Sequence, residues 1–335
     1  MADSSRHNPG SGVATSLDRA TLRKLLRSIY GTPCHIVSYT TIRDGDDYAV
    51  AIVTLTEPMA RVVVKLAGPR AALACPFDRT AAITRVVRDR TALPAPEVFA
   101  ADVSYRDWPC RYIVMAHVDG ATWAEEGPSL DATAWRDLYG QLGRAVARLH
   151  SIRFPAYGEI GADGPVLGDG SLVTALQERA RRRVADPRHA ELFVALLRDR
   201  AHLFDDAPEP ALCHEDLNPT NILVRHDDGR WPLAAVLDFD SAWTGSPESD
   251  LARLELWQSG AYPGLMDEGF RAAYEETHII APGYEGRRPI YQLLWCLEYA
   301  SASPQHMSDT VCVCAELGIP PIPFVREESD GAPTV

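Results

Sequence analysis

Lysine is almost absent from this chain of 335 residues, in which Lys and Arg together number 33 and Asp and Glu number 46. Only Lys24 and Lys65 are lysines, so arginine supplies nearly every positive charge. The formal net charge of −13 argues against a protein that binds nucleic acids, because such proteins present a basic face to the phosphate backbone. The negative charge would suit a cationic small-molecule partner, or solubility alone.

Long apolar runs are also missing. No stretch approaches the roughly 18 residues that a membrane-spanning helix requires, and the first 15 residues contain no apolar signal region. The seven cysteines are scattered, and the close pair Cys312 and Cys314 has no second pair to complete a zinc site. We therefore expect a cytoplasmic protein with free thiols that binds neither membranes nor nucleic acids.

Several common catalytic motifs are absent. The chain has no G-x-x-x-x-G-K-[ST] phosphate loop, no G-x-G-x-x-G after a strand, no G-x-S-x-G turn and no H-E-x-x-H pair. These absences count against P-loop nucleotide enzymes and against common dehydrogenases, hydrolases and zinc proteases.

The first third of the chain shows the pattern of an antiparallel sheet with helices. We expect a helix from an N-cap at Ser16 to Leu26, and a second helix over 77–90 that ends before a Pro-rich segment. Runs rich in Val, Ile, Thr and Tyr, with a hairpin turn at 43–47, indicate the strands. The expected strands are 35–41, 48–55, 61–66, 97–100 and 111–116.

The rest of the chain is mainly helical. Apolar residues at a spacing of three and four predict one helix with a buried stripe, formed by Trp135, Leu138, Leu142, Val146 and Leu149. Further helices are expected over 172–184, 189–203, 247–257, 265–277 and 289–301, with short strands at 222–224 and 234–237. Residues 1–15 and 326–335 are expected to be disordered.

Two motifs in this second part point to phosphoryl transfer. His214-x-Asp216-x-x-x-x-Asn221 leads into a strand, and Asp238-Phe239-Asp240 follows another. Phosphoryl transfer requires a carboxylate that takes the proton of the acceptor hydroxyl, which Asp216 would supply. It also requires hard oxygen ligands for Mg²⁺, which Asn221 and Asp238 would supply. Either motif alone could arise by chance in an acidic chain, but their order and their neighbouring strands favour the functional interpretation.

Lys65 adds independent weight because this chain uses arginine almost everywhere else. It lies in the strand 61–66, from which a compact ammonium group can reach the phosphates of a nucleotide. The alternative is a strand residue that extends its charged end into solvent.

On these motifs the chain resembles the aminoglycoside phosphotransferase family, the small-molecule branch of the protein-kinase-like fold. The match extends over roughly residues 30–310. It rests on Val63-Val64-Lys65, on the two motifs above and on Ser246-Pro247-Glu248-Ser249-Asp250-Leu251-Ala252. The resemblance implies an α+β, two-lobed fold: an N-lobe of antiparallel sheet plus helix over 16–116, a hinge over 117–120 and a mainly helical C-lobe over 121–325.

The resemblance also implies ATP, or GTP, with Mg²⁺ in the cleft, and it assigns roles to residues. Asp216 would be the catalytic base, Asn221 and Asp238 the magnesium ligands, and Lys65 would bind the nucleotide phosphates. His214 would be structural and would hold the loop that carries Asp238.

In the strand 112–116 and the turn after it, Met115 would line the adenine pocket, and backbone groups of Ala116 and Val118 would bind the adenine edge. An ordinary core strand with a turn is compatible with the same residues. Asp250, which follows a Ser-Pro pair typical of a helix start, would brace the catalytic loop through backbone amides. Its alternative is a first-turn carboxylate that favours the helix dipole.

The chain departs from the family pattern at three points. Glu215 stands where the family usually has Gly, and it either pairs with an arginine, which we favour, or faces the substrate. The nucleotide loop has one glycine, Gly45, among Asp44, Asp46 and Asp47, which we expect to face solvent because they would repel phosphates. Asp78 is the nearest candidate for the Glu that usually pairs with the strand lysine.

Carboxylates in the expected substrate-side segments could bind the amines of an aminoglycoside. The alternative is that they lie on the solvent-exposed faces of amphipathic helices, which give the same sequence pattern. They are Asp267, Glu268, Glu275, Glu276 and Glu298. We therefore expect an ATP-dependent O-phosphotransferase, monomeric or homodimeric, whose favoured acceptor is an aminoglycoside-like antibiotic, as in antibiotic resistance. A macrolide, choline, homoserine or a sugar is the alternative acceptor. A nucleotide-binding pseudokinase is the alternative from another class, whereas a protein kinase is disfavoured because no A-P-E segment follows the second motif.

Overall fold

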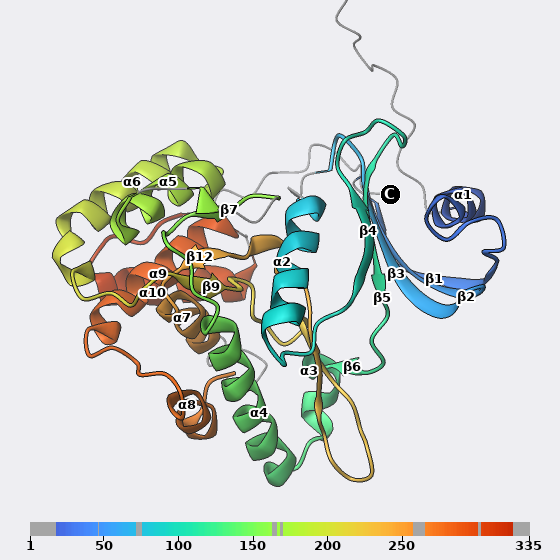
Figure 1. Ribbon diagram of the computed structural model, residues 1–335. Coiled ribbons are helices and arrows are strands. Elements are labelled where there is room, and N and C mark those ends of the chain that lie inside the picture. The colour runs from blue at the N-terminus through green and yellow to red at the C-terminus, as the bar shows by residue number, and fades with distance from the viewer. Residues whose placement is uncertain are drawn as a thin grey trace, which may run out of the picture. The chain divides into compact units, whose positions relative to one another are not determined.

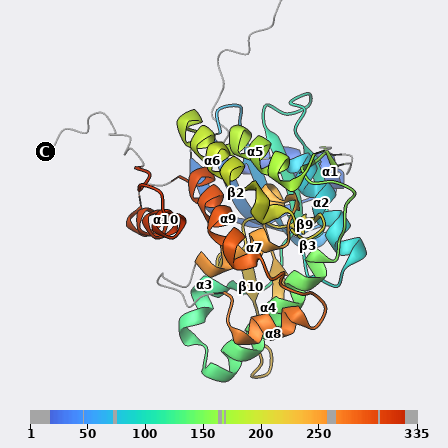
Figure 2. The same ribbon diagram turned by 90° about the vertical axis from the view of Figure 1, so that its left-hand side faces the viewer.

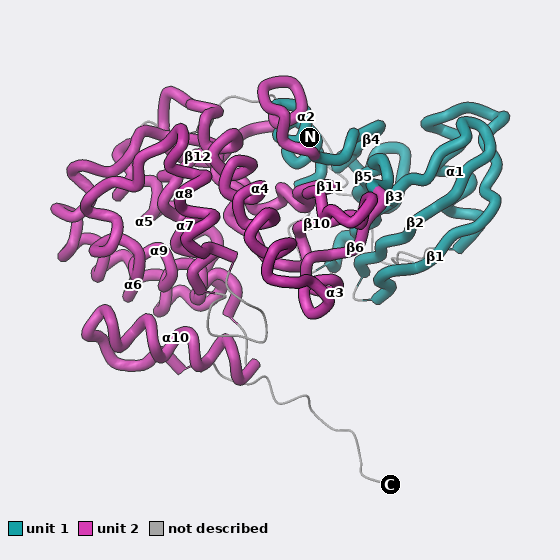
Figure 3. Tube along the Cα trace, turned by 90° about the horizontal axis from the view of Figure 1, so that it is seen from below, with its two compact units in different colours: residues 1–86, 95–118 teal, residues 87–94, 119–335 magenta. Residues whose placement is uncertain are grey.

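The computed structural model describes residues 18–45, 47–71, 76–162, 166–167, 170–256, 265–300 and 303–323. The expected disordered ends, 1–15 and 326–335, lie outside the described residues. The chain divides into two compact units (Figure 3). Unit 1 contains the chain up to Val86 together with Ala95–Val118, and unit 2 contains Val87–Pro94 and the chain from Asp119. The segment Val87–Pro94, which we had assigned to the N-lobe, thus groups with unit 2.

Unit 1 is built on a five-stranded antiparallel sheet with the strand order β1-β2-β3-β5-β4. Its elements are α1 (Arg19–Tyr30), β1 (Ile36–Gly45), β2 (Tyr48–Thr56), β3 (Met59–Ala67), α2 (Phe77–Arg90), β4 (Val98–Asp102) and β5 (Arg111–Ala116). The last residues of α2 belong to unit 2.

Helix α1 begins and ends later than the sequence indicated. Its N-cap is Asp18, whose carboxylate accepts the backbone N–H groups of Ala20 and Thr21 at 2.8 Å. The expected cap, Ser16, lies outside the described residues. The helix extends to Tyr30 and ends at Gly31, which has a positive φ of 87°. Asp18 lies two residues after Ser16, and an aspartate can accept the first backbone N–H groups of a helix as effectively as a serine can. This explains why the helix starts later than expected.

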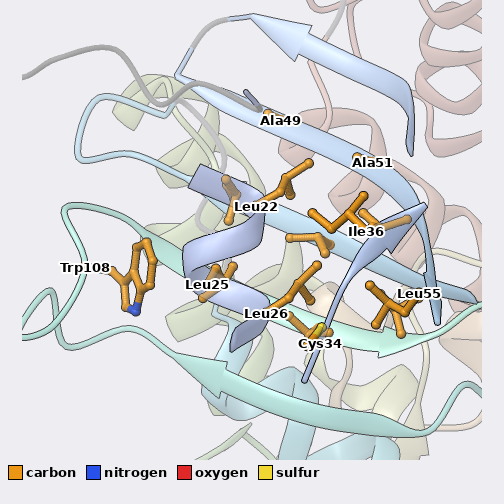
Figure 4. Packing of buried hydrophobic residues seen from close by; sticks show 14 of the residues in the cluster. Leu22, Leu25, Leu26, Cys34, Ile36, Ala49, Ala51, Leu55 and Trp108 are labelled. Carbon is orange, nitrogen blue, oxygen red and sulfur yellow. The ribbon is translucent and has the colours of Figure 1, made fainter. Parts of the chain in front are cut away.

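The sheet of unit 1 has two apolar faces, and α1 and α2 cover opposite ones (Figure 1). The leucines of α1, Leu22, Leu25 and Leu26, pack against one face (Figure 4). Side chains alternate between the faces along a strand. On β3, Val62 and Val64 pack with α1, so Lys65 lies on the face towards α2.

Unit 2 is mainly helical, with small antiparallel strand pairs. Its helices are α3 (Trp123–Glu126), α4 (Ala132–His150), α5 (Leu172–Arg183), α6 (Pro187–Asp199), α7 (Glu248–Leu256), α8 (Glu268–Glu275), α9 (Tyr284–Glu298) and α10 (Pro304–Leu317). Single 3₁₀ turns lie at Gly127–Ser129, Ala201–Phe204 and Phe239–Ser241. Its strands are β6 (Ala121–Thr122), β7 (Glu159–Ile160), β8 (Val166–Leu167), β9 (Ala211–Cys213), β10 (Ile222–Val224), β11 (Leu233–Val236) and β12 (Trp243–Gly245).

The core of unit 2 forms around α4 and α9. In α4, Leu138, Leu142, Val146 and Leu149 are buried, as their spacing predicted. Helices α5, α6 and α7 contact α9 (Figure 2). No helix in the ranges that the structure describes is long and apolar enough to cross a membrane.

Helix α9 starts at Tyr284, five residues before the expected start at Pro289, which lies inside the helix. A contact with another helix explains this earlier start. Arg287, in the early turns, forms a buried bidentate ion pair with Glu248 of α7, with both N–O distances at 2.6 Å. That pair fixes the first turns of α9 against α7, although proline usually marks a helix start.

Candidate active site

The two sequence motifs lie on adjacent loops of unit 2. The first loop runs from the end of β9 to the start of β10, and the second follows β11. Strands β10 and β11 are antiparallel with Ile222 opposite Val236. The Leu237 amide donates to the Asn221 carbonyl at 2.8 Å. Asp238, the next residue after Leu237, therefore lies close to Asn221 at the end of the first loop.

His214 ties these two loops together. Its Nε2 lies 2.8 Å from the Leu237 carbonyl oxygen, and its Nδ1 accepts the Asp216 amide at 3.2 Å. Because Nδ1 accepts a hydrogen bond, the ring proton is on Nε2, which donates to Leu237. The ring also packs on Phe239, with the centroids 4.6 Å apart. The structure thus places His214 where the resemblance implied, next to the residue that precedes Asp238.

The carboxylate of Asp250, in α7, holds the first loop through hydrogen bonds from its backbone amides. Its Oδ2 accepts the His214 amide at 2.8 Å, and its Oδ1 accepts the Glu215 amide at 2.7 Å. His150 Nε2 lies 3.0 Å from Oδ2. Burial alone would raise the pKa of Asp250, but hydrogen bonds from His150 and His214 outweigh it and lower the pKa below its usual value.

His150 was not predicted from the sequence as a residue of the site. It is fully buried, and its Nδ1 lies 2.9 Å from the hydroxyl of Tyr274 in α8. The helical spacing could have identified this histidine. His150 follows Val146 by four residues and therefore lies on the apolar stripe of α4. A histidine at such a position requires buried polar partners, and Asp250 and Tyr274 are those partners.

Asp216 is held in place but is still partly accessible. Its Oδ2 accepts Asn221 Nδ2 at 2.9 Å and its Oδ1 accepts Asn218 Nδ2 at 3.1 Å. The side chain is 25% exposed. Burial raises the pKa of Asp216, and Arg253, with Nη2 3.8 Å from Oδ1, only partly opposes this. An oriented carboxylate with a raised pKa is suited to accept a proton.

Arg253 is a second residue of the site that was not predicted from the sequence. It lies in α7 three residues after Asp250, and burial lowers its pKa to about 10. Its guanidinium carbon lies 3.5 Å from the ring centroid of Trp295 in α9. The guanidinium is thus packed between an aromatic ring and the Asp216 carboxylate.

Asn221 and Asp238 form a donor set suited to Mg²⁺. Both contacts of the Asn221 amide to Asp216 use Nδ2, at 3.0 Å to the carbonyl and 2.9 Å to Oδ2. This orientation leaves the amide oxygen Oδ1 for another partner. The carboxylate of Asp238 follows on the adjacent loop, at a positive φ of 65°. An amide oxygen and a carboxylate are the hard ligands that Mg²⁺ prefers, so these residues fit the metal.

Glu215 pairs with an arginine, as we had favoured. It has a positive φ of 66°, the conformation that glycine adopts without strain. Its side chain is buried. Oε1 accepts Trp243 Nε1 at 2.6 Å and the Ser249 hydroxyl at 2.5 Å, and Oε2 lies 3.0 Å from Arg179 Nη1. Burial raises the pKa of Glu215, and Arg179 opposes that rise.

The residues expected to bind the nucleotide belong to unit 1. Lys65 is paired with Val50 of β2 and Ile113 of β5, on the sheet face towards α2. Met115 lies opposite Val63, on the same face. Gly45 ends β1 opposite Tyr48.

The end of β5 and the residues after it form the segment that was expected to bind the adenine edge. His117 donates to the Arg61 carbonyl at 3.0 Å, so the neighbouring Ala116 is in a non-hydrogen-bonded position relative to β3. The Ala116 amide donates instead to the Glu97 carbonyl at 2.7 Å. Within the described residues, the Val118 amide donates to no backbone carbonyl. The Val118 amide is therefore available for the contact with an adenine edge that the resemblance implies.

One expectation for the acidic residues of unit 1 is contradicted by the structure. The expectation that Asp47 faces solvent was wrong: its side chain is 4% exposed, and its Oδ2 accepts the Arg70 amide at 2.8 Å. The Asp47 carboxylate instead accepts a backbone N–H group of the turn that follows β3. Asp44 is exposed as expected, and Asp46 lies outside the described residues. Asp78 accepts the Arg79 amide at 2.8 Å in the first turn of α2, and its pairing with Lys65 stays a prediction.

Comparison with known proteins connects this geometry to an enzyme family. A family model described as the phosphotransferase enzyme family matches residues 38–290. The chain belongs to this family. It is therefore a phosphotransferase that acts on hydroxyl groups, which confirms both the expected family and the expected enzyme class. No curated protein sequence matches the chain.

Solved structures of the phosphotransferase family share the fold. A thermostable mutant of the aminoglycoside phosphotransferase APH(4)-Ia, in complex with AMP-PNP and hygromycin B, is 18% identical with a TM-score of 0.61, over 89% of this chain and 97% of its own. The streptomycin–ATP complex of APH(2")-IIa is 16% identical with a TM-score of 0.58, over 91% and 100%. A microcompartment-associated aminopropanol kinase is 18% identical with a TM-score of 0.50, over 90% and 95%. These similarities confirm the α+β, kinase-like fold.

The carboxylates expected on the substrate side are mostly engaged within the phosphotransferase itself. Asp267 caps α8 through the Phe270 amide at 2.8 Å. Glu276 lies 3.4 Å from Arg144 at the surface. Glu298, which we had expected to face the substrate, is buried and forms a bidentate pair with Arg179.

Proposed function

We propose that this phosphotransferase transfers the γ-phosphoryl group of ATP to a hydroxyl group of a small molecule, with Asp216 as the catalytic base. The observation that carries the proposal is the position of Asp216, a partly exposed carboxylate held by Asn218 and Asn221. The same Asn221 side chain leaves its amide oxygen for a metal ion. The nucleotides in the neighbouring complexes, AMP-PNP and ATP, support ATP as the donor.

Asp216 would act on the acceptor directly. The hydroxyl hydrogen-bonds to a carboxylate oxygen of Asp216, and its oxygen attacks the γ-phosphorus while the bond between the γ-phosphorus and the β–γ bridging oxygen breaks. ADP leaves with that bridging oxygen, and the Asp216 carboxylate takes the proton of the hydroxyl. Asn218, Asn221 and Arg253 hold the carboxylate in one orientation, so that little motion is needed when the proton moves. The hydrogen bonds that the His214 and Glu215 amides donate to Asp250 keep the backbone next to Asp216 in place.

Asn221 Oδ1 and the carboxylate of Asp238 would hold Mg²⁺. When bound, the ion neutralises charge on the phosphates of the nucleotide. His214 and the Leu237–Asn221 hydrogen bond keep the two ligand-bearing loops in register. The positions of both ligands therefore depend on His214, although it would touch neither the metal nor the substrate.

In unit 1, Lys65 would bind the nucleotide phosphates, and Gly45 would lie at the phosphate-side turn. Met115 would contact the base, while the Ala116 carbonyl and the Val118 amide would bind its edge. GTP stays open as an alternative donor, because the edge-binding groups belong to the backbone.

The acceptor is not determined by the family or the fold. The neighbours bind hygromycin B, streptomycin and gentamicin, and one is an aminopropanol kinase. An aminoglycoside-like antibiotic, with a role in resistance, and a small metabolite therefore both stay candidate acceptors. A cytoplasmic location and a monomeric or homodimeric state stay predictions.

The test combines ADP release with nucleotide binding. Asp216→Ala should lower kcat by more than tenfold with every acceptor and leave Mg²⁺-dependent stabilisation by nucleotide largely unchanged. Asn221→Ala and Asp238→Ala should instead weaken that stabilisation. Retention of more than about a tenth of kcat in Asp216→Ala, a loss below about 1.4 kcal/mol, would exclude Asp216 as the base. Nucleotide binding without ADP release on any acceptor would favour the pseudokinase alternative.

A further inference from the structure

Unit 2 contains a cavity of about 250 Å³ that the proposed reaction does not use. The segment after α4, the loop before β9, the start of α7 and the segment after α8 form its walls. At about 30 Å³ per water molecule, this volume is that of roughly eight waters, so a small organic molecule fits. The apolar part of its lining consists of Pro208, Pro247, Leu251, Ile279 and Ile280. Ile279 is 87% exposed, which places the opening of the cavity just after α8.

The cavity is also lined by Arg153, which forms no ion pair with a residue that the structure describes. Its Nη1 donates to the Glu209 carbonyl at 3.0 Å. The backbone around it is fixed, because Arg153 forms a β-bridge with Ala211 and the Phe154 amide donates to the Pro210 carbonyl at 3.2 Å. Nε and Nη2 make no hydrogen bond within the described part of the chain. These two nitrogens form an edge with which a guanidinium binds a carboxylate through two parallel hydrogen bonds.

A carboxylate and an imidazole line the same cavity, but neither cancels the charge of Arg153. Glu248 is 1% exposed, and its two oxygens accept from Nε and Nη2 of Arg287 at 2.6 Å each, so its charge is compensated inside the protein. Burial, together with the nearby His150 and Arg153, lowers the pKa of His278. The His278 ring is therefore uncharged at neutral pH. The lining thus has a net positive charge, which Arg153 carries.

We propose that this cavity is a binding site, separate from the catalytic loop, for a small monocarboxylate with an apolar body. The carboxylate would pair with Nε and Nη2 of Arg153, and the body would pack on the apolar residues of the lining. A cation would be repelled by Arg153, and an inorganic anion would leave the apolar lining uncovered. The lining lies wholly within unit 2 and does not include Asp216, so the inference does not depend on the proposed function.

Hydrogen bonds connect the wall of this cavity to the catalytic loop. Tyr274 lines the cavity, and its hydroxyl lies 2.9 Å from His150 Nδ1. His150 Nε2 lies 3.0 Å from Asp250 Oδ2. The Asp250 carboxylate accepts the His214 and Glu215 amides at 2.8 and 2.7 Å. A ligand that restrains Tyr274 also restrains this network, so we expect its binding to slow local opening of the catalytic loop.

The first arm of the test measures binding to the full wild-type chain with three probes. Benzoate has a carboxylate and an apolar ring, benzamide has the ring without the charge, and acetate has the charge without the ring. At equal concentration and ionic strength, benzoate should raise the melting temperature and give a saturable calorimetric titration, whereas benzamide and acetate should do neither. No benzoate binding, or an equal effect of benzamide or acetate, would overturn the inference. Competition between ATP and benzoate would also overturn it, because the ligand would then occupy the catalytic site.

The second arm uses Arg153→Met, with Arg148→Met as the matched control. Arg148 is exposed in the last turn of α4 and does not line the cavity. Arg153→Met should lose the rise in melting temperature that benzoate causes, and Arg148→Met should keep it. Equal rises in the two variants would overturn the inference. If Arg153→Met does not fold, the comparison of benzoate with benzamide and acetate on the wild type still decides it.

Hydrogen exchange tests the connection to the catalytic loop. Saturating benzoate should slow exchange of the His214 and Glu215 amides by about threefold or more in the wild type. The effect should be smaller in Tyr274→Phe, which keeps the ring in the cavity wall but loses the contact with His150. Unchanged exchange in wild type with benzoate bound would overturn the connection and leave the binding site standing. None of these measurements requires turnover, so a failure of ADP release would count against the proposed function alone.

Discussion

Replacement of Glu215 by glycine should destabilise the protein, even though the family usually has glycine at this position. Two effects oppose each other. Glycine removes the strain of a left-handed conformation at φ 66°, which costs a residue with a side chain about 1–2 kcal/mol. It also removes one carboxylate from a buried ion pair with Arg179, a loss of about 3–5 kcal/mol. The ion pair is the larger effect.

The network around Glu215 increases the loss. The Trp243 indole N–H and the Ser249 hydroxyl both donate to Oε1, and a buried donor without an acceptor costs about 1–3 kcal/mol. Glu298 still binds Arg179 in the variant, so the penalty is not that of an isolated buried charge. We therefore expect Glu215→Gly to lower the free energy of unfolding by about 2–4 kcal/mol.

Urea unfolding followed by tryptophan fluorescence measures this difference. Glu215→Gln is the matched control, because it keeps the backbone strain and a hydrogen-bond acceptor but loses the charge. Its stability should lie between those of wild type and Glu215→Gly. If Glu215→Gly is as stable as wild type, or more stable, then backbone strain outweighs the ion pair and the reasoning is refuted.

Three other substitutions test separate parts of the fold. Gly143→Ala should destabilise the contact of α4 with α8, because a Cβ would lie 2.4 Å from the Phe270 carbonyl oxygen, whereas an unchanged melting temperature would show that the helices can move apart. Leu26→Ala should cost about 2–5 kcal/mol in calorimetry, since Leu26 is fully buried between α1 and the sheet; a loss below 1 kcal/mol would contradict that packing. Asp250→Asn should be less stable than wild type at neutral pH, and the difference should shrink as the pH falls below about 4, because a carboxylate with a lowered pKa stabilises the folded state only while it is ionised. A difference that does not change with pH would show that Asp250 does not act through its charge.

Segments with a strong local pattern were predictable from the sequence. Helix α2 and strand β5 have the bounds that the sequence indicated, since a Pro-rich segment ends the first and β-branched residues mark the second. Helix α10 was not predicted. Its residues include two cysteines, a histidine and several polar residues, and its 3.6-residue apolar period is weak.

In the candidate site, the sequence indicated which residues matter but not how they are held. The motif spacing pointed to Asp216 and Asn221, and the pairing of Glu215 with an arginine was expected. The identity of that arginine depends on tertiary structure, because Arg179 lies on a helix well before the motif in the chain. For the same reason Glu298 looked like a substrate-binding carboxylate, although it is bound to Arg179. Charge and position along the chain do not show which opposite charge the fold brings near.

Asp250 has a consequence for how this sequence can change over time. One carboxylate accepts from the catalytic-loop amides and from His150, and His150 in turn contacts Tyr274 of α8. An asparagine offers only one acceptor atom where the aspartate offers two, and a glutamate would push its head group into a closed space. One hydrogen-bond network therefore connects helices α4, α7 and α8 to the catalytic loop. A substitution that moves one of these helices is tolerated only when compensating substitutions keep the other two helices and the loop in contact with Asp250.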